Sequence, residues 1–331
     1  MSSAAELDGR VAEVRAALQQ ARAEIGKRVV GQDEVVDGML MALVAGGHVL
    51  LEGAPGLAKT RAVRALAEVV DASYSRIQFT PDLLPADLLG TMVYRPQTGE
   101  FVARRGPVFA QIVLADEINR APAKVQSALL QAMEERQITI GERTFGLPEP
   151  FMVLATQNPL EHEGTYPLPE AQLDRFLLKL QVPYPSFEDE LAVVRLVGDR
   201  PDSEVRRALD PQRVADLQRI IAGVRVDRRI EEYIVAIVRA TRAADRATHD
   251  RVVEYARFVE HGASPRASIA FYRCSKIRAV LEGRAYVLPE DVKAVAAPLL
   301  RHRIITSYQA ESEEVSADAI VALVLDQVEV P

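Results

Sequence analysis

The chain of 331 residues has a single cysteine, no long apolar run and no excess of basic residues, and each absence excludes a class of protein. Cys274 alone can form neither an internal disulfide nor a cysteine-based zinc cluster, and we expect it to be a packing residue. No run of about 18 apolar residues could cross a bilayer, and the first residues, MSSAAELDGR, lack the basic-then-apolar order of a secretion signal. The net charge of −7 gives no global attraction for nucleic acid, although a local basic groove stays open. We therefore expect a cytoplasmic protein with no membrane insertion and no nucleic-acid partner.

The composition is that of an ordinary globular protein, with 48% apolar and 26% charged residues, and the length suggests about two domains. Five short segments are nearly continuous apolar runs, typical of parallel strands covered on both faces: residues 48–52, 75–80, 109–116, 151–156 and 176–182. Apolar residues at helical spacing predict helices at residues 5–28, 32–47, 60–70 and 121–136. This alternation predicts an α/β layered core.

Two insertions interrupt this core, and its pattern ends before the chain does. Residues 92–105 and 138–147 each have two strand-like arms around a short turn, which predicts β-hairpins. After the stretch VPYPSFEDE, glycines are few and long helical patterns replace the apolar runs. We therefore expect a boundary at residues 183–187. The predicted division is an N-terminal helix at 1–29, an α/β core at 30–185 and an all-helical domain at 186–331.

The stretch GAPGLAKT, Gly53 to Thr60, lies between a predicted strand and a predicted helix, which is the context of a phosphate-binding loop. Its backbone N–H groups would hold a polyphosphate, with Lys59 reaching the terminal phosphates and the Thr60 hydroxyl binding Mg²⁺. Ala58 stands where the usual pattern has glycine. We expect its backbone to be helical already, so that a methyl group is tolerated there. A chance Gly/Pro turn is the alternative.

The segment QIVLADEINR is an apolar strand that ends in two carboxylates, Asp116 and Glu117. At the carboxyl edge of a parallel sheet they would lie beside the loop. There Asp116 would orient the shell of a Mg²⁺ ion, and Glu117 would polarise an attacking water. The alternative is a strand that simply ends in acidic residues at a solvated edge.

Three later segments carry weaker signals. Asn158 follows a predicted strand in FMVLATQNP and would lie near the terminal phosphate, although Asn-Pro is also an ordinary turn. Arg175, in LPEAQLDRF, would stabilise charge on a transferring phosphoryl group of a neighbouring subunit, or form a surface ion pair with Asp174 or Glu170. In GASPRAS the Ser-Pro step predicts a helix start from which Arg266 projects, itself an unremarkable arrangement.

Taken together and in this order, GAPGLAKT, LADEINRA, ATQNP, LPEAQLDRF and GASPRA resemble the segments of AAA+ ATPases, and more narrowly of the short MoxR family in the helix-2-insert clade. The resemblance extends from about Val30 to the region of Arg303. MoxR proteins have alanine before the loop lysine, as at Ala58. The resemblance implies an α/β, three-layer AAA+ core with a parallel five-stranded sheet and β-hairpin insertions, followed by an all-helical lid domain.

The same resemblance implies which residues meet the nucleotide. Lys59 and Thr60 are similar to the Walker A lysine and magnesium hydroxyl, and Asp116 and Glu117 to the Walker B pair. Thr60 and Asp116 would thus hold the metal. The residues expected to bind ATP or ADP with Mg²⁺ are Val30, Gly31, Gln32, Gly53, Ala54, Pro55, Gly56, Leu57, Ala58, Lys59, Thr60, Arg61 and Asp116.

Further roles concern catalysis and assembly. Asn158 resembles sensor 1, Arg175 the arginine finger that acts across a subunit boundary, and Arg266 sensor 2 in the lid. Both hairpins would face the axial pore of a homo-oligomeric ring, expected to be a hexamer. Family members act as chaperone-like ATPases, often on a protein with a von Willebrand factor A domain.

The resemblance therefore implies Mg²⁺-dependent ATP hydrolysis coupled to remodelling of a protein client. Two alternatives stay open. One is a nucleotide-gated binding scaffold with slow turnover, and the other is a motor subunit like those of magnesium chelatase or helicases. The acidic balance and the absence of a basic-aromatic tract disfavour nucleic acid.

Overall fold

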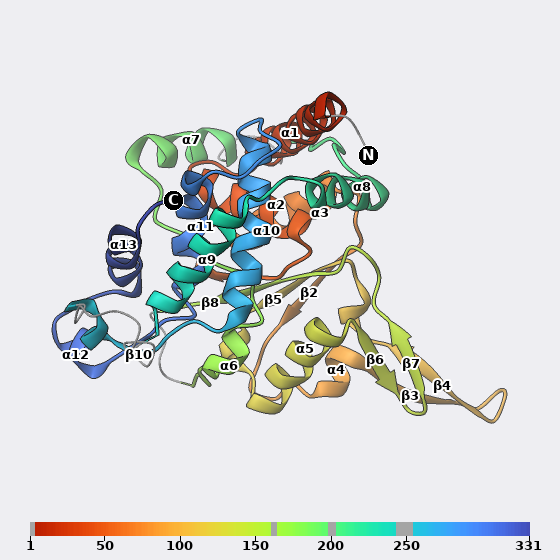
Figure 1. Cartoon of the computed structure of the whole chain (residues 1–331). Coiled ribbons are helices and arrows are strands. Elements are labelled where there is room, and N and C mark those ends of the chain that lie inside the picture. The colour runs from red at the N-terminus through yellow and green to blue at the C-terminus, as the bar shows by residue number, and fades with distance from the viewer. Residues whose placement is uncertain (1–3, 160–163, 198–202, 243–253) are drawn as a thin grey trace. The chain divides into compact units, whose positions relative to one another are not determined.

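A computed structural model of the protein describes residues 4–159, 164–197, 203–242 and 254–331 (Figure 1). Contacts between residues divide the chain into two compact units. The α/β unit comprises Gln19–Phe176 and Leu180–Ala215. The helical unit comprises Met1–Leu18, Leu177–Lys179 and Asp216–Pro331. Within the described ranges, no helix is long and apolar enough to cross a membrane.

The α/β unit contains four whole strands of a five-stranded sheet in the order β2-β5-β8-β1-β9, and the division between the units falls within β9. The pairs β2 with β5, β5 with β8 and β8 with β1 are parallel. β5 is buried along its whole length and β8 along all but its last residue, as central strands of a covered sheet are. The strands match the five apolar runs of the sequence: β1 Val49–Glu52, β2 Tyr74–Gln78, β5 Ile112–Asp116, β8 Met152–Gln157 and β9 Leu178–Gln181.

Helices of this unit begin and end where local chemistry favours it. α2, Asp33–Ala45, ends at Gly46, whose φ of 67° lets its N–H reach carbonyls of the last turn. α3, Lys59–Val69, starts within the glycine loop and buries an apolar face, and α5, Ala123–Glu135, follows Pro122. The remaining elements of this part of the chain are α4 Pro85–Leu89, α6 Glu170–Leu173, α7 Phe187–Val197, η1 Pro107–Phe109, η2 Ile118–Arg120 and the first residues of α8 Pro211–Ala222.

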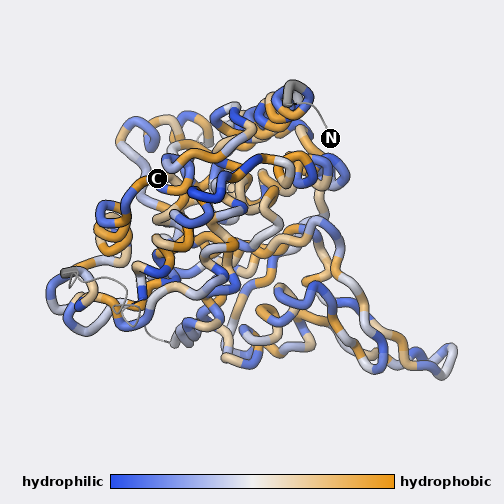
Figure 2. The backbone as a smooth tube through the Cα atoms, viewed as in Figure 1, coloured by the Kyte–Doolittle hydropathy of each residue, from blue (hydrophilic) through white to orange (hydrophobic). Residues whose placement is uncertain are grey.

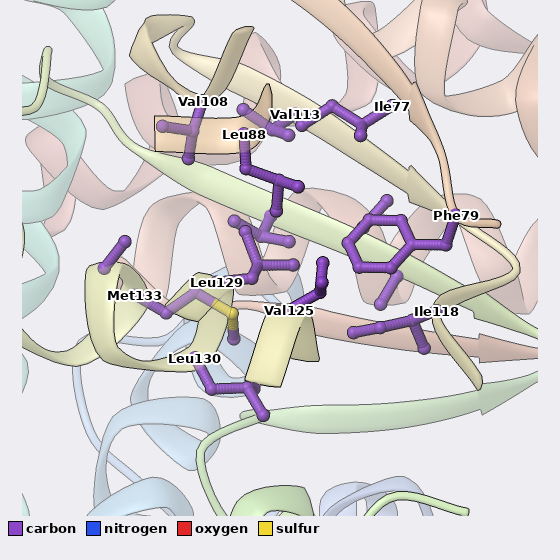
Figure 3. Close-up of a cluster of buried hydrophobic side chains, with 14 of the residues drawn as sticks. Ile77, Phe79, Leu88, Val108, Val113, Ile118, Val125, Leu129, Leu130 and Met133 are labelled. Atoms are coloured by element: carbon purple, nitrogen blue, oxygen red, sulfur yellow. The ribbon is translucent and has the colours of Figure 1, made fainter. Parts of the chain in front are cut away.

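One apolar cluster anchors the strands that carry the candidate carboxylates (Figure 3). Phe79 lies just after β2, Leu88 belongs to α4 and Leu129 belongs to α5, and all three are fully buried. Burying a side chain of this size contributes about 1.5–3 kcal/mol. The cluster therefore holds the carboxyl ends of β2 and β5 against two helices.

Both predicted hairpins are present. The first pairs β3, Gly90–Arg95, with β4, Glu100–Arg105, and it projects as a long arm with apolar segments along it (Figures 1 and 2). The second pairs β6, Gln137–Ile140, with β7, Arg143–Gly146.

Two cation–π contacts of one arginine join the bases of the two hairpins. The guanidinium carbon of Arg105, at the end of β4, lies 5.2 Å from the ring centre of Phe109 and 4.9 Å from that of Phe145 in β7. The two rings are 6.4 Å apart in an edge-to-face arrangement. Each such contact contributes about 0.5–1 kcal/mol at a partly exposed site. The first hairpin is thus attached at its base to the second.

The helical unit is formed mainly by helices of the C-terminal third. Its described elements are the first part of α1 Ala4–Gly26, the end of α8, α9 Arg228–Ala240, η4 Glu254–Phe258, α10 Pro265–Leu281, α11 Pro289–Leu300, α12 Tyr308–Ser312 and α13 Ala317–Gln327. A small antiparallel sheet pairs β10, Val259–His261, with β11, Ile305–Thr306. The sequence pattern did not predict this sheet, because strands of three and two residues are too short to show alternation.

A buried ion pair and a buried thiol lie within the helical unit. Arg284 donates two 2.7 Å hydrogen bonds to the two carboxylate oxygens of Asp291, a residue of the first turn of α11. Cys274 is fully buried in α10, and burial raises the pKa of its thiol to about 12. The thiol is therefore unreactive, as expected of a packing residue.

The compact units do not coincide with the predicted division of the chain. The described residues 188–197 and 203–215 belong to the α/β unit, although they follow the expected boundary at 183–187. One contact that ties them there is the Arg28 guanidinium, which donates from Nε to the Ser203 carbonyl oxygen over 2.7 Å. The three-part division thus stays a prediction, and the first three residues of its N-terminal helix lie outside the described ranges.

Candidate functional site

The carboxyl ends of four parallel strands bring the predicted motifs to one edge of the sheet. The registers align Glu52 of β1 with Gln157 of β8, and Gln78 of β2 with Asp116 of β5. At the start of the loop, the Gly53 N–H donates to the Gln157 carbonyl oxygen over 3.2 Å. The loop, the acidic pair and the polar end of β8 are therefore neighbours, as at ligand sites of open α/β sheets.

Two glycines of the loop are required for different structural reasons. A side chain at Gly53 would place its Cβ 2.7 Å from the Val182 carbonyl oxygen, so only glycine fits there. Gly56 has a φ of +84° and open space where a side chain would stand. Its role is to supply the backbone turn.

Lys59 lies against the loop itself. Its Nζ donates to the carbonyl oxygens of Gly53 and Ala54, the latter over 2.9 Å. Burial lowers the pKa of Lys59, while the charges of Asp116 and Glu117 raise it. The ammonium group thus lies in the field of both carboxylates and donates to two backbone oxygens of the loop.

The backbone of Ala58 corrects one expectation. Ala58 is the N-cap of α3 with φ 58° and ψ 17°, in the left-handed region, so the predicted helical backbone was wrong. For a residue with a methyl group this conformation costs roughly 1 kcal/mol. The physical reason is that the conformation is set by the turn that leads from Gly56 into α3, and not by the helix propensity of alanine.

Both carboxylate oxygens of Asp116 have partners. Oδ1 accepts a 2.6 Å hydrogen bond from the Thr156 hydroxyl, and Oδ2 accepts from Arg76 at 2.6 Å from Nη2 and 3.1 Å from Nε. The Asp116 side chain is 11% exposed. Arg76 is on β2 and Thr156 on β8, so the two neighbouring strands hold this carboxylate from either side.

Glu117 is held by strained backbone and by side chains. Its φ of 57° and ψ of 51° are left-handed, an arrangement that often marks a functional residue. Its N–H donates to Thr156 Oγ1 over 2.8 Å, and its Oε2 accepts from Gln78 Nε2 over 2.8 Å. Arg120 Nε lies 3.1 Å from the same oxygen. Thr156 therefore connects the two carboxylate residues, as acceptor for one and donor to the other.

The predicted adenine segment lies in the same unit. Gln32 is buried, and its Nε2 donates to the Pro183 carbonyl oxygen over 2.9 Å. Among the described residues, the buried Gln32 Oε1 has no hydrogen-bond partner. Gly31 has a φ of +70°, and a side chain there would press against Asp189. A buried acceptor without a donor fits a ligand that brings an amino group.

The predicted sensor and finger residues lie in different units of the structure. Asn158 is buried directly after β8. Arg175 pairs with Glu134 of α5, Nε to Oε2 at 2.8 Å. Arg266 belongs to the helical unit.

The start of α10 is as predicted. Ser264 is the N-cap and accepts from the Arg266 N–H over 3.1 Å, and Pro265 is the first helical residue. The other predicted nucleotide contacts are Val30, Ala54, Pro55, Leu57, Thr60 and Arg61, all in the α/β unit beside the residues already described.

Sequence reasoning missed three residues of this network: Arg76, Gln78 and Thr156 in its connecting role. Arg76 and Gln78 appear in the sequence only as polar positions of a predicted strand. Their spacing of two residues would have placed them on one strand face, but only the register shows that this face meets Asp116 and Glu117.

The residues present fit a magnesium nucleotide. Thr60 and Asp116 offer oxygen ligands, which a hard cation prefers. The described residues contain no group of three or more His, Cys, Asp or Glu side chains that would bind a metal alone. Mg²⁺ commonly binds through one or two protein oxygens together with phosphates and water.

Comparisons with known proteins agree with this geometry. The model of the ATPase family associated with various cellular activities matches residues 48–178, and that of the AAA lid domain matches residues 255–323. The chain is 47% identical to Chaperone MoxR1 of Mycobacterium tuberculosis over 98% of this chain and 85% of that protein. It is 33% identical to Protein MoxR of Methylorubrum extorquens over 96% of each.

A solved structure adds the fold. The crystal structure of a candidate ATPase from Cytophaga hutchinsonii superposes with a TM-score of 0.89 at 45% identity, covering 98% of this chain and 97% of that one. The predicted architecture, a parallel five-stranded α/β core with a helical lid, is thereby confirmed. With near-complete coverage and a matching phosphate loop, acidic strand end and lid, the chain belongs to the MoxR family of AAA+ ATPases.

Proposed function

We propose that the protein hydrolyses ATP in the cytoplasm with Mg²⁺, as a homo-oligomeric ring, and uses the cycle to remodel a protein client. The observation that carries the proposal is the meeting of Lys59, Asp116 and Glu117 at one edge of the sheet. A cation for the phosphates, a ligand for the metal and a base for the water are the parts that phosphoryl transfer to water needs.

Binding is assigned to the loop and to the segment before α2. The inward N–H groups at the start of α3 would hold the phosphates, and Lys59 would exchange loop carbonyls for phosphate oxygens. The unpaired acceptor Gln32 Oε1 favours adenine over guanine if it faces position 6 of the base, where adenine has an amino donor and guanine has a carbonyl acceptor. Gln32→Leu is therefore expected to lower the ratio of ATP to GTP affinity, measured by calorimetry. An unchanged ratio would remove Gln32 from adenine recognition.

The chemical step is assigned to Glu117. Bound Mg²⁺ would supply charge stabilisation to the phosphates, held through Thr60 and Asp116. Glu117 would accept the proton of the attacking water, and its fixed backbone and the Thr156 contact would keep the carboxylate in place. Asn158, buried at the end of β8, would orient the water and the terminal phosphate.

Assembly is needed to complete the site. Arg175 would reach the nucleotide of the next subunit and Arg266 would act from the lid, each placing positive charge where negative charge develops. Arginine supplied from a neighbour contributes on the order of 10³–10⁵ in rate in related phosphoryl transfers. Turnover per subunit should therefore rise steeply with protein concentration.

The concentration dependence provides the test. Arg175→Ala should bind ATP normally, measured by calorimetry, and hydrolyse it slowly at every concentration. Arg228→Ala is the control, because Arg228 also pairs with a glutamate on a helix but is exposed at the start of α9. Monomer that hydrolyses ATP as fast as assembled protein would contradict the ring-dependent mechanism.

The client is proposed to meet the first hairpin. Tyr94 and Phe101 face each other across β3 and β4 with ring centres 5.2 Å apart, and both are more than half exposed. Exposed aromatic pairs on a projecting hairpin mark contact sites for protein. A client with a von Willebrand factor A domain is the specific proposal. Phe101→Ser should abolish stimulation of turnover by that client and leave basal turnover unchanged.

One observation also favours a scaffold with slow turnover as the second candidate. The Glu117 carboxylate is already bound by Gln78 and Arg120. Without a partner that releases it, this carboxylate would not accept a proton from water. Turnover measured with and without client separates the two functions, since a scaffold gains little rate from its partner.

A further inference from the structure

The carboxylate of Asp116 already has a cationic partner, Arg76. Two N–H groups of the guanidinium converge on one oxygen, Oδ2, with Nη2 at 2.6 Å and Nε at 3.1 Å. The other oxygen, Oδ1, accepts from the Thr156 hydroxyl. Any cation that binds Asp116 must therefore share this carboxylate with a guanidinium or displace it.

Burial explains why such a partner is needed. The Asp116 side chain is 11% exposed, and a carboxylate removed from water is stable only when it is paired or bound to a metal. The Arg76 side chain is 49% exposed. It can therefore leave Asp116 for water at little desolvation cost, while Asp116 cannot follow it.

Gln78 also contacts Arg76 and fixes the position of its guanidinium group. Arg76 and Gln78 lie two residues apart on β2 and hence on one face of the strand. Arg76 Nη2 also donates to Gln78 Oε1 over 3.0 Å, and Gln78 Nε2 donates to Glu117 Oε2 over 2.8 Å. Side-chain contacts thus run without interruption from Asp116 through Arg76 and Gln78 to Glu117.

We propose that Arg76 is a positioning residue that holds the place of the metal at Asp116 and is displaced when a divalent cation binds with the nucleotide. The inference rests on the proposed function, because it requires a metal-nucleotide site. Two positive groups on one carboxylate repel each other, so the guanidinium competes with the metal. Arg76 therefore stabilises the nucleotide-free site and raises the Mg²⁺ concentration that nucleotide binding requires.

The test uses mant-ADP fluorescence on the full chain, with MgCl₂ titrated into protein and nucleotide. Arg76→Gln should lower the half-saturating Mg²⁺ concentration about fivefold, the range of an ion pair at a partly exposed site. In EDTA without nucleotide, its melting temperature should fall by about 2–4 °C. A structural role alone would move the melting temperature and leave the Mg²⁺ dependence unchanged. Arg76→Thr removes the same charge with a side chain that suits a strand, and it serves if the glutamine variant does not fold.

Two further variants serve as controls for the effect of charge and for the effect of losing a different ion pair. Arg76→Lys keeps the positive charge and should keep a half-saturating Mg²⁺ concentration near that of the wild type. Arg64→Gln is the matched control, since Arg64 forms an ion pair with Glu68 on α3 without touching Asp116. An unchanged or higher Mg²⁺ requirement in both charge-removing variants overturns the inference. Wild-type protein that binds no mant-ADP contradicts the proposed function itself, and normal wild-type binding separates the two failures.

Discussion

The two ends of the parallel strands differ in the side chains that they hold: charged side chains at the carboxyl ends and a buried histidine at the amino ends. At the carboxyl ends lie Asp116 and Glu117, with left-handed backbone at Glu117 and a network of charged contacts. At the amino ends His48 is fully buried just before β1. Its Nδ1 accepts the Val153 N–H over 3.0 Å, and its ring packs edge-on against Phe151.

The difference lies in how each end treats charge. Burial is the main cause that lowers the pKa of His48 from 6.5 to about 4, so this end holds a neutral ring whose hydrogen bonds only stabilise. At the carboxyl end, Asp116 and Glu117 are paired with Arg76, Arg120 and polar side chains. We therefore expect the amino end to contribute stability and the carboxyl end, under the proposed function, to contribute catalysis. Substitutions at the carboxyl ends should therefore mainly change turnover, and substitutions at the amino ends should mainly change stability.

The largest effect is expected from Glu117→Gln at the carboxyl end. Loss of the base should lower turnover by about 10²–10⁴ and leave ATP affinity nearly unchanged, because the amide keeps the shape but takes no proton. Steady-state phosphate release and calorimetry measure the two quantities. Glu135→Gln, at an exposed glutamate of α5, is the control and should hydrolyse ATP normally. Wild-type turnover in the Glu117 variant would remove this residue from the mechanism.

The amino end should be sensitive to acid. Because the folded pKa of His48 is below that of the unfolded chain, the unfolded state takes up a proton first, and stability is lost as the pH falls from about 6.5 towards 4. Between pH 7.5 and pH 5 this loss is roughly 2 kcal/mol. It should shrink in His48→Gln, as measured by urea unfolding at both pH values. The control His261→Gln, at an exposed histidine, should keep the wild-type dependence.

A substitution at the junction of the acidic pair should affect both stability and rate. Thr156→Val removes the bond to Asp116 and leaves the Glu117 N–H without its acceptor, at a cost of about 2 kcal/mol in unfolding free energy. Turnover should fall as well, because Glu117 loses its anchor. Thr139→Val, in an exposed threonine pair of the second hairpin, should cost less than about 0.5 kcal/mol. Equal losses in the two variants would show that Thr156 has no special role.

The smallest effect concerns the backbone of the loop. Ala58→Gly should raise the unfolding free energy by up to about 1 kcal/mol, because glycine accepts the left-handed conformation without strain. Ala171→Gly, in the short helix α6, should act in the opposite direction by a similar amount. Urea unfolding of both variants at pH 7.5 tests the sign. A destabilised Ala58→Gly protein would mean that the strain is compensated elsewhere in the loop.

Sequence patterns predicted the elements well where one segment carried its own signal. Continuous apolar runs located all five strands of the sheet, and a strand followed directly by two acids located Asp116 and Glu117. The loop was recognised from glycine spacing and its flanking elements. Its detailed backbone was not predictable, because Ala58 is ordinarily a helix former and only the surrounding turn forces it into the left-handed region.

What depends on register between distant segments could not be predicted. Arg76 and Gln78 look like any polar residues of a half-covered strand until β2 pairs with β5 and sets Gln78 opposite Asp116. The alternative interpretation of Arg175 was an ion pair with a sequence neighbour, and nothing in the sequence indicated that folding brings Glu134 of α5 to it. The roles of Arg175 and Arg266 also depend on neighbouring subunits and on the lid, and those roles remain predictions.

The cation–π contacts of Arg105 with Phe109 and Phe145 have a mechanical consequence. A long two-stranded ribbon attached only by its ends would bend freely and dissipate any pull on its tip. Because these contacts attach the base of the first hairpin to the second, which begins two residues after α5, we expect a pull at the tip to be transmitted to that helix. The same helix carries Glu134, so we expect strain applied far out on the arm to reach the side chain that restrains Arg175.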